Sequence, residues 1–111
     1  MVDVLMSAYN AENTIERAVN SVLDQTYQRF KLYVFDDCST DSTYDILKDI
    51  SDPRLVVIRS NKNIGTYASK NYMLKNFCKS PYIALHDADD ISEPRRLQLQ
   101  VSGMSYRPSL A

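Results

Sequence analysis

The feature of this sequence that most constrains its fold is an alternation of short apolar segments with segments of helical periodicity. Strand-like segments are expected at residues 2–9, 30–37, 54–60 and 81–87. They are apolar throughout, as in parallel strands that helices cover on both faces. The sequence therefore predicts an α/β fold, an open, doubly wound, mostly parallel sheet of about four strands with flanking helices.

The first expected helix follows the first strand and carries the clearest signals. Asn13 is followed three residues later by Glu16, a capping-box pattern that predicts where the helix starts. Apolar residues recur after it at helical spacing. They predict a buried face made of Ile15, Ala18, Val19, Val22 and Leu23.

The later helices are marked by caps and turns. Ser39, Thr40 or Asp41 can cap the second helix, which is expected to bury Tyr44, Ile46, Leu47 and Ile50. A third helix is expected after a turn at Gly65, with a buried face that includes Tyr67, Tyr72 and Met73. A last helix is expected to start near Glu93 and Pro94, because proline suits a first turn.

Composition excludes several classes of protein. A chain of 111 residues with 44% hydrophobic and 24% charged residues indicates one soluble globular domain. Its net charge of -1 provides no field for nucleic acid or an anionic membrane, so neither is expected as a partner. The sequence has no apolar run of about 18 residues, so no membrane span is expected. Cys38 and Cys78 show no disulfide or zinc spacing, which favours a cytoplasmic setting.

Polar clusters follow three of the four expected strands. They occupy residues 7–10, 36–41 and 86–90. In open doubly wound sheets, ligands bind outside the carboxyl ends of the strands. We therefore expect these three loops to converge on one rim and to form a binding site there.

The third cluster contains Asp87, Asp89 and Asp90, three carboxylates within four residues. Such a group is self-repelling unless solvent or a cation relieves it. Magnesium or manganese takes one or two carboxylates and completes its shell with water and substrate phosphates. Asp36 and Asp37 can instead have a structural role, because the helix dipole favours acidic side chains at the amino end of a helix. His86 fits either a ligand contact or a hydrogen-bonded structural histidine.

Four stretches together resemble a known family in order and spacing. They are MSAYNAENTIERAVNSVLDQTY, YVFDDCSTDST, NKNIGTYASKN and YIALHDADD. They closely resemble the nucleotide-sugar half of family 2 glycosyltransferases with the GT-A fold, over roughly residues 2–99. The resemblance implies a Rossmann-like, truncated GT-A nucleotide-sugar-binding domain at residues 1–101. Residues 102–111 would be a tail, and the acceptor half would be absent.

The resemblance also implies roles for residues at the strand ends. Ser7, Ala8 and Tyr9 would contact the nucleobase and ribose, partly through backbone groups. Asp37 would accept a hydrogen bond from the base, with a uracil N–H as the usual donor, and Glu12 would assist there.

Further roles concern the phosphates and the metal. Asp87 and Ala88 would lie near the ribose or the metal, and Asp87 and Asp89 would hold the Mn²⁺ or Mg²⁺ that bridges the diphosphate. Lys70 stands where the family often has arginine, so its phosphate contact would be a point charge. Cys38 stands where the family often has glycine, so the turn after the second strand is less permissive.

The function that the resemblance implies is transfer of a sugar from a nucleotide-diphosphate sugar, most often a UDP-sugar, to an acceptor hydroxyl with inversion. The acceptor would be a glycan or lipid-linked, and the full-length form could then work at the cytoplasmic face of a membrane. No catalytic residue is assigned, because the family's base belongs to the acceptor half. This chain alone is thus expected to bind donor and to transfer sugar poorly or not at all.

The alternative is a non-catalytic nucleotide-binding or assembly module that lacks the acceptor half. A receiver domain would need its acid pair after the first strand, and a dinucleotide oxidoreductase would need a glycine-rich turn. An open sheet edge also predicts weak self-association.

Overall fold

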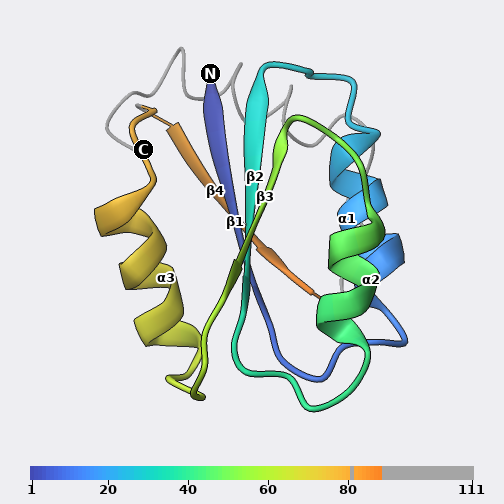
Figure 1. Ribbon diagram of the computed structural model, residues 1–111. Helices are drawn as coiled ribbons and strands as arrows, with labels where there is room; N and C mark the ends of the chain where they lie inside the picture. The colour runs from blue at the N-terminus through green and yellow to red at the C-terminus, as the bar shows by residue number, and fades with distance from the viewer. Residues whose placement is uncertain (81, 89–111) are drawn as a thin grey trace.

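The computed structural model describes residues 1–80 and 82–88 (Figure 1). Within that part of the chain, strands and helices alternate as predicted. Their bounds are β1 Val2–Ala8, α1 Ile15–Leu23, β2 Phe30–Asp36, α2 Thr43–Asp49, β3 Leu55–Arg59, α3 Thr66–Asn76 and β4 Tyr82–Asp87. In these described ranges, no helix has the length and apolar character needed to cross a membrane. The helix expected near Glu93 and Pro94, and the boundary predicted after residue 101, lie outside the described residues.

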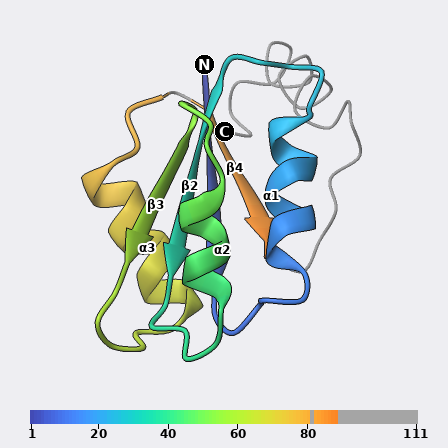
Figure 2. The same ribbon diagram turned by 45° about the vertical axis from the view of Figure 1, so that its right-hand side comes forward.

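The four strands form one sheet in the order β3-β2-β1-β4, and every neighbouring pair is parallel. Helices α1 and α2 cover one face and α3 covers the other (Figures 1 and 2). The predicted doubly wound α/β fold is therefore confirmed. From β1 the chain adds β2 and β3 on one side, and then returns to add β4 on the other. The strand order thus reverses between β1 and β4, which makes this the switch point of the sheet.

The core has two layers because successive side chains of a strand point to opposite faces. On the face of α1 and α2, Met6 and Val34 belong to a cluster with Val19 and Leu47. On the face of α3, the buried cluster is Leu5, Tyr33, Phe35 and Met73. Each fully buried large apolar side chain contributes about 1.5–3 kcal/mol, so both layers hold the strands in place beneath the rim.

The start of α1 differs from the prediction. The N-cap is Thr14, without a side-chain capping bond, so the capping box of Asn13 and Glu16 is wrong. The hydroxyl of Thr14 instead donates to the carbonyl oxygen of Ala88 at 3.0 Å. This tertiary contact with the end of β4 competes with the local pattern. The predicted buried face of α1 is confirmed at all five positions.

The second helix also starts later than the predicted caps. Its N-cap is Ser42, again without a side-chain capping bond. The N–H of Thr43 donates to Asp41 Oδ1 at 2.9 Å, so the acid acts one residue ahead of the cap position. The hydroxyls of Ser39 and Thr40 contact another loop instead.

The third helix starts after Gly65, as predicted, and Gly65 has a φ of 88° that favours glycine. Met73 is fully buried, but the tyrosine predictions are wrong, since Tyr67 is 83% exposed and Tyr72 is 45% exposed. Only the row of Ser69 and Met73 is buried on this helix. A helix that presents one narrow row to a sheet leaves its other aromatic positions at the surface.

Candidate functional site

A pocket of about 430 Å³ lies at the carboxyl ends of the strands, at the switch point. Ser7 comes from β1, and Ala88 comes directly after β4. The full lining is Ser7, Tyr9, Asn10, Ala11, Thr14, Thr66 and Ala88. Of the residues predicted to bind a nucleotide sugar, the structure thus brings Ser7, Tyr9 and Ala88 to one hollow.

Two hydrogen bonds through Asn10 connect the loop after β1 to the loop after β2. The N–H of Asn10 donates to Ser39 Oγ at 2.9 Å, and the N–H of Thr40 donates to Asn10 Oδ1 at 2.8 Å. Asn10 has a φ of 48°, a left-handed conformation that asparagine tolerates. The pocket wall at Asn10 is therefore held by residues about 30 positions away in the sequence.

Glu12 and Asp41 extend this connection. The N–H of Ser42 donates to Glu12 Oε2 at 3.0 Å, and the N–H of Glu12 donates to Asp41 Oδ2 at 3.3 Å. Burial tends to raise the pKa of Asp41, but hydrogen bonds from Thr43 and Glu12 outweigh it, so this pKa is lowered. Glu12, predicted to assist at the base, does not line the pocket and binds the start of α2 instead.

Asp37 connects the loop after β2 to the start of α3. Its Oδ1 accepts the N–H of Ile64 and its Oδ2 accepts the N–H of Gly65, both at 2.8 Å. The side chain is buried. Each carboxylate oxygen has lone pairs for more than one hydrogen bond, so these bonds leave capacity for a further donor. Sequence reasoning placed Asp37 at the site but missed that it shapes the loop before α3.

Ala8 and Ser7, two more of the predicted binding residues, make hydrogen bonds within the chain. The carbonyl oxygen of Ala8 accepts the N–H of Asp37 at 2.8 Å, while the Ala8 side chain is buried. The hydroxyls of Ser7 and Ser69 share a hydrogen bond of 2.7 Å, which joins β1 to α3. Lys70, the next residue of α3, is partly buried. The Ala8 carbonyl oxygen thus binds within the chain, and its contact with a nucleotide stays a prediction.

Arg59 is a charged residue at the rim that sequence reasoning missed. It is the last residue of β3 and the register partner of Asp36. Its Nε lies 3.7 Å from Asp36 Oδ2, and its guanidinium lies 4.3 Å from the centre of the Tyr44 ring. The signal available in the sequence was that β3 ends in Arg59 while the neighbouring strand, β2, ends in Asp36.

Cys38 has a φ of 62°, in the left-handed region that favours glycine. The family that the four motifs resemble often has glycine at this position, and the left-handed backbone supplies the physical reason. At the other end of the sheet, where the strands begin, burial and the charge of Asp3 raise the pKa of Cys78 to about 11. A thiol in that state is a poor nucleophile. His86 is a buried residue near the end of β4.

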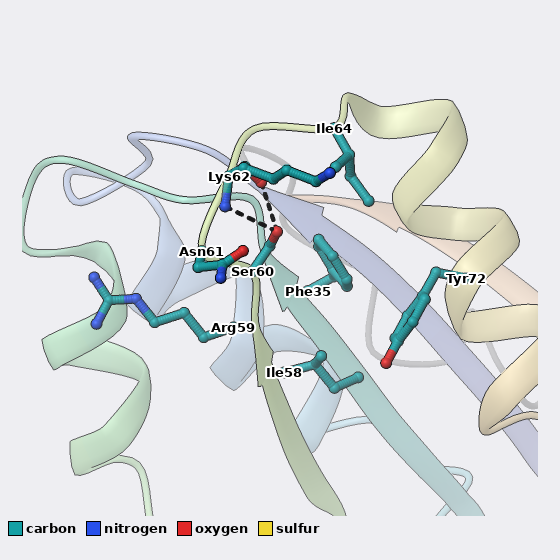
Figure 3. Close-up of a pocket in the computed structure, with 8 residues that line it drawn as sticks. All are labelled: Phe35, Ile58, Arg59, Ser60, Asn61, Lys62, Ile64 and Tyr72. Atoms are coloured by element: carbon teal, nitrogen blue, oxygen red, sulfur yellow. Dashed lines mark hydrogen bonds between the residues drawn. The ribbon is translucent and has the colours of Figure 1, made fainter.

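A second hollow, of about 460 Å³, lies between β3 and α3 (Figure 3). Its lining is Phe35, Ile58, Arg59, Ser60, Asn61, Lys62, Ile64 and Tyr72. Figure 3 shows the Arg59 guanidinium pointing away from the apolar side chains of this hollow. None of the predicted binding residues lines it, so the pocket at the switch point is the candidate site.

Comparison with known families identifies the chain. The model of the family described as "Glycosyl transferase family 2" matches residues 3–110. The chain belongs to this family. The resemblance inferred from the four sequence motifs is thereby confirmed, together with the GT-A fold of its structural neighbours.

Two family 2 relatives from Escherichia coli are each 36% identical over 104 residues. They are WfaP and WfgD, both named UDP-Glc:alpha-D-GlcNAc-diphosphoundecaprenol beta-1,3-glucosyltransferase. Each match covers 94% of this chain and 41% of the relative. The chain therefore spans about two fifths of the length of these family 2 enzymes.

Solved structures share the fold of this chain. TarS 1–349 from S. aureus, in complex with UDP-GlcNAc, matches with a TM-score of 0.86 and 27% identity, over 95% of this chain and 31% of TarS. The mannosyltransferase PcManGT from Pyrobaculum calidifontis, in complex with GDP-Man and Mn²⁺, matches with a TM-score of 0.78. At 23% identity, over 87% of this chain and 30% of that protein, PcManGT shows the fold alone.

The metal ligands predicted from the sequence are Asp87 and Asp89. Asp87 is the last residue of β4 and the register partner of Ser7. Asp89 lies outside the described residues. Within the described part, no group of three or more His, Cys, Asp or Glu side chains could hold a metal ion. A magnesium or manganese ion needs only one or two carboxylates when phosphates complete its shell, and Asp87 and Asp89 stay its predicted ligands.

Proposed function

We propose that this chain is the donor-binding part of a glycosyltransferase that takes a sugar from a nucleotide-diphosphate sugar, most often a UDP-sugar. The observation that carries the proposal is the pocket at the switch point, framed by Ser7, Tyr9 and Ala88. Doubly wound sheets bind nucleotides at this place. The complexes of TarS with UDP and UDP-GlcNAc support a uridine nucleotide.

In this proposal the nucleoside lies across the ends of β1 and β2. Ser7, Ala8 and Tyr9 contact the base and ribose, and Tyr9 has the half-exposed ring needed for such a contact. Asp37 accepts a hydrogen bond from the base while it holds the N–H groups of Ile64 and Gly65. Glu12 supports this side indirectly, through its bond to the start of α2.

The diphosphate then points toward the end of β4. Asp87 and Asp89 are the proposed ligands of a divalent ion, Mn²⁺ or Mg²⁺, which when bound would stabilise the negative charge of the leaving nucleoside diphosphate. Lys70 would add a positive charge on the side of α3, and Ala88 forms the floor beside the phosphates. Ser7 connects the two sides through its bond to Ser69.

The acceptor and the general base for inverting transfer are proposed to lie in sequence beyond this chain, because the relatives are more than twice as long. Alone, the chain would bind donor and transfer little or no sugar. WfaP carries a name that specifies a diphosphoundecaprenol acceptor. A lipid-linked acceptor of that kind would bring the full-length protein to the cytoplasmic face of a membrane.

Calorimetric titration of the purified chain with UDP, with and without Mn²⁺, tests the proposal. We expect binding that strengthens with Mn²⁺ and that weakens at least about tenfold in Asp37→Asn and Asp89→Ala, because each removes a charge-assisted contact. The matched control is Asp45→Ala, which removes an exposed carboxylate of α2. If the folded chain binds none of UDP, GDP and dTDP, the proposal is wrong.

A further inference from the structure

We propose that Arg59 is a positioning residue for the nucleotide pocket, which acts through buried Asp36 and the loop after β2. The effect on nucleotide affinity rests on the proposed function, whereas the effect on the loop does not.

The carboxylate of Asp36 is fully buried at the end of β2. Its Oδ1 accepts the N–H of Ser39 at 3.4 Å, a long hydrogen bond. Within the described part of the chain, no hydrogen bond reaches Oδ2. The cation that pairs with Oδ2 there is Arg59, at 3.7 Å. A buried carboxylate is costly without a partner, so this ion pair decides how well the end of β2 tolerates its charge.

Arg59 is itself held in place although its side chain is half exposed. The guanidinium lies 4.3 Å from the centre of the Tyr44 ring on α2. Figure 3 shows the side chain extending away from Phe35 and Tyr72. A planar guanidinium can stack on a ring and pair with a carboxylate at the same time, which a lysine ammonium does less well. Arg59 therefore fixes β3, the end of β2 and α2 relative to one another.

Two hydrogen bonds connect this ion pair to the pocket. Asp36 accepts the N–H of Ser39, and Ser39 Oγ in turn accepts the N–H of Asn10 at 2.9 Å. Asn10 and its neighbour Tyr9 line the pocket. Without Arg59, the buried carboxylate would draw in water or move, and the Ser39 contact that holds Asn10 would loosen. Arg59 thus orders a binding wall that it does not itself touch.

The experiment compares Arg59→Met and Arg59→Lys with the matched control Arg54→Met. Arg54 also pairs with an aspartate, Asp52, and its guanidinium lies 4.7 Å from the centre of the Phe30 ring. It differs in position, because it lies just before β3, whereas Arg59 is the last residue of that strand. Residue-resolved amide hydrogen exchange of the purified chain reports the order of the loop without any ligand. Titration with UDP, with and without Mn²⁺, reports the pocket.

In Arg59→Met we expect the amides of Ser39 and Asn10 to exchange at least about tenfold faster, with core amides of β1 and β2 unchanged. UDP affinity should fall about 2- to 30-fold, and Arg59→Lys should recover part of both effects because it restores the charge. Arg54→Met should lower protection across the chain without a selective effect at Ser39.

Two results would overturn the inference. One is unchanged exchange at Ser39 and Asn10 in Arg59→Met. The other is a uniform loss of protection like that of Arg54→Met, which would make Arg59 a stabilising residue only. If the wild-type chain binds no UDP, the proposed function fails, but the exchange data still decide whether Arg59 orders the loop. If Arg59→Met does not fold, Arg59→Lys supplies the same selective exchange test.

Discussion

At the amino-terminal ends of the strands, here called the amino edge, the Arg54 side chain binds Asp52 through two hydrogen bonds of 3.0 and 3.1 Å. It also donates to the carbonyl oxygen of Leu23 and to Gln28 Oε1. At the carboxyl rim, Arg59 meets Asp36 at 3.7 Å through a single contact. The two arginines have the same kinds of partner, an aspartate and an aromatic ring. They differ in how many of their donors the chain itself uses.

The buried acids show the same contrast. Asp3 at the amino edge accepts the N–H groups of Lys79 and Ser80 on one oxygen, at 3.0 and 3.1 Å. Burial and the nearby charge of Asp3 also raise the pKa of Cys78. Asp37 at the rim accepts one N–H on each oxygen and ties loops around a pocket. The amino edge is thus built for stability, whereas the rim combines stability with contacts that remain open to a ligand.

The largest expected effect is that of Asp3→Ala, which breaks the amino edge alone. Two N–H groups lose a buried, charged acceptor, so we expect the free energy of unfolding to fall by about 3 kcal/mol. Urea unfolding measures this loss. Asp3→Asn is the control, because its amide oxygen keeps an acceptor and should cost less. UDP affinity of the folded fraction should not change, and a parallel loss of affinity would contradict the separation of the two edges.

The next effect is that of Thr43→Val at the rim. Thr43 Oγ1 accepts the N–H of Ala11 at 2.8 Å and is fully buried. Valine has the same shape but no acceptor, so stability should fall by about 1–2 kcal/mol, and UDP should bind more weakly because Ala11 lines the pocket. Thr43→Ser keeps the hydroxyl and serves as the control. Equal affinity in Thr43→Val and wild type would show that the inter-loop contacts do not shape the pocket.

Acid should weaken both edges. Hydrogen bonds from Arg54 lower the pKa of Asp52 below its usual 3.8, and the pKa of Asp41 is lowered too. Because these folded-state pKa values are depressed, the stabilisation is complete above the unfolded value and is lost as pH falls through the folded one. Each group should contribute about 1 kcal/mol or less, given its exposure. Chemical unfolding from pH 6 to about pH 2.5 measures the slope.

Arg54→Met separates the two contributions to this acid effect. It should remove the larger part of the share of Asp52, since only the backbone N–H of residue 54 still donates to that carboxylate, and it should keep the share of Asp41, so the slope should become shallower without disappearing. An unchanged slope in Arg54→Met would show that Asp52 is not stabilised by Arg54.

The smallest effect is expected from Cys38→Gly at the rim. Cys38 has a φ of 62°, so glycine would relieve strain in the folded state while adding entropy to the unfolded state. The net stabilisation should be about 0.5 kcal/mol, measured as a rise in the urea midpoint. Cys78→Gly at the amino edge is the contrast and should destabilise the chain. A loss of stability in Cys38→Gly would mean that the thiol packs better than its backbone conformation suggests.

Local patterns predicted much of this fold because they report burial directly. The apolar spacing of α1 gave its buried face correctly, and Gly65 marked the turn before α3. The same logic failed for Tyr67, because helical spacing alone does not tell how wide a row α3 presents to the sheet. The polar clusters after β1, β2 and β4 predicted the rim, since parallel strands end at the same edge.

By itself, the sequence determined the order of strands and helices, the family, and the loops that form the site. Only the tertiary structure decided the partners of the polar residues in those loops. The sequence indicated a ligand role for Glu12, a capping role for Asp41 and no role for Thr14, yet all three bind chain segments 29 to 74 residues away. The physical reason is that packing β1 between β2 and β4 brings distant loops together, and buried donors and acceptors must then be satisfied by whatever lies beside them.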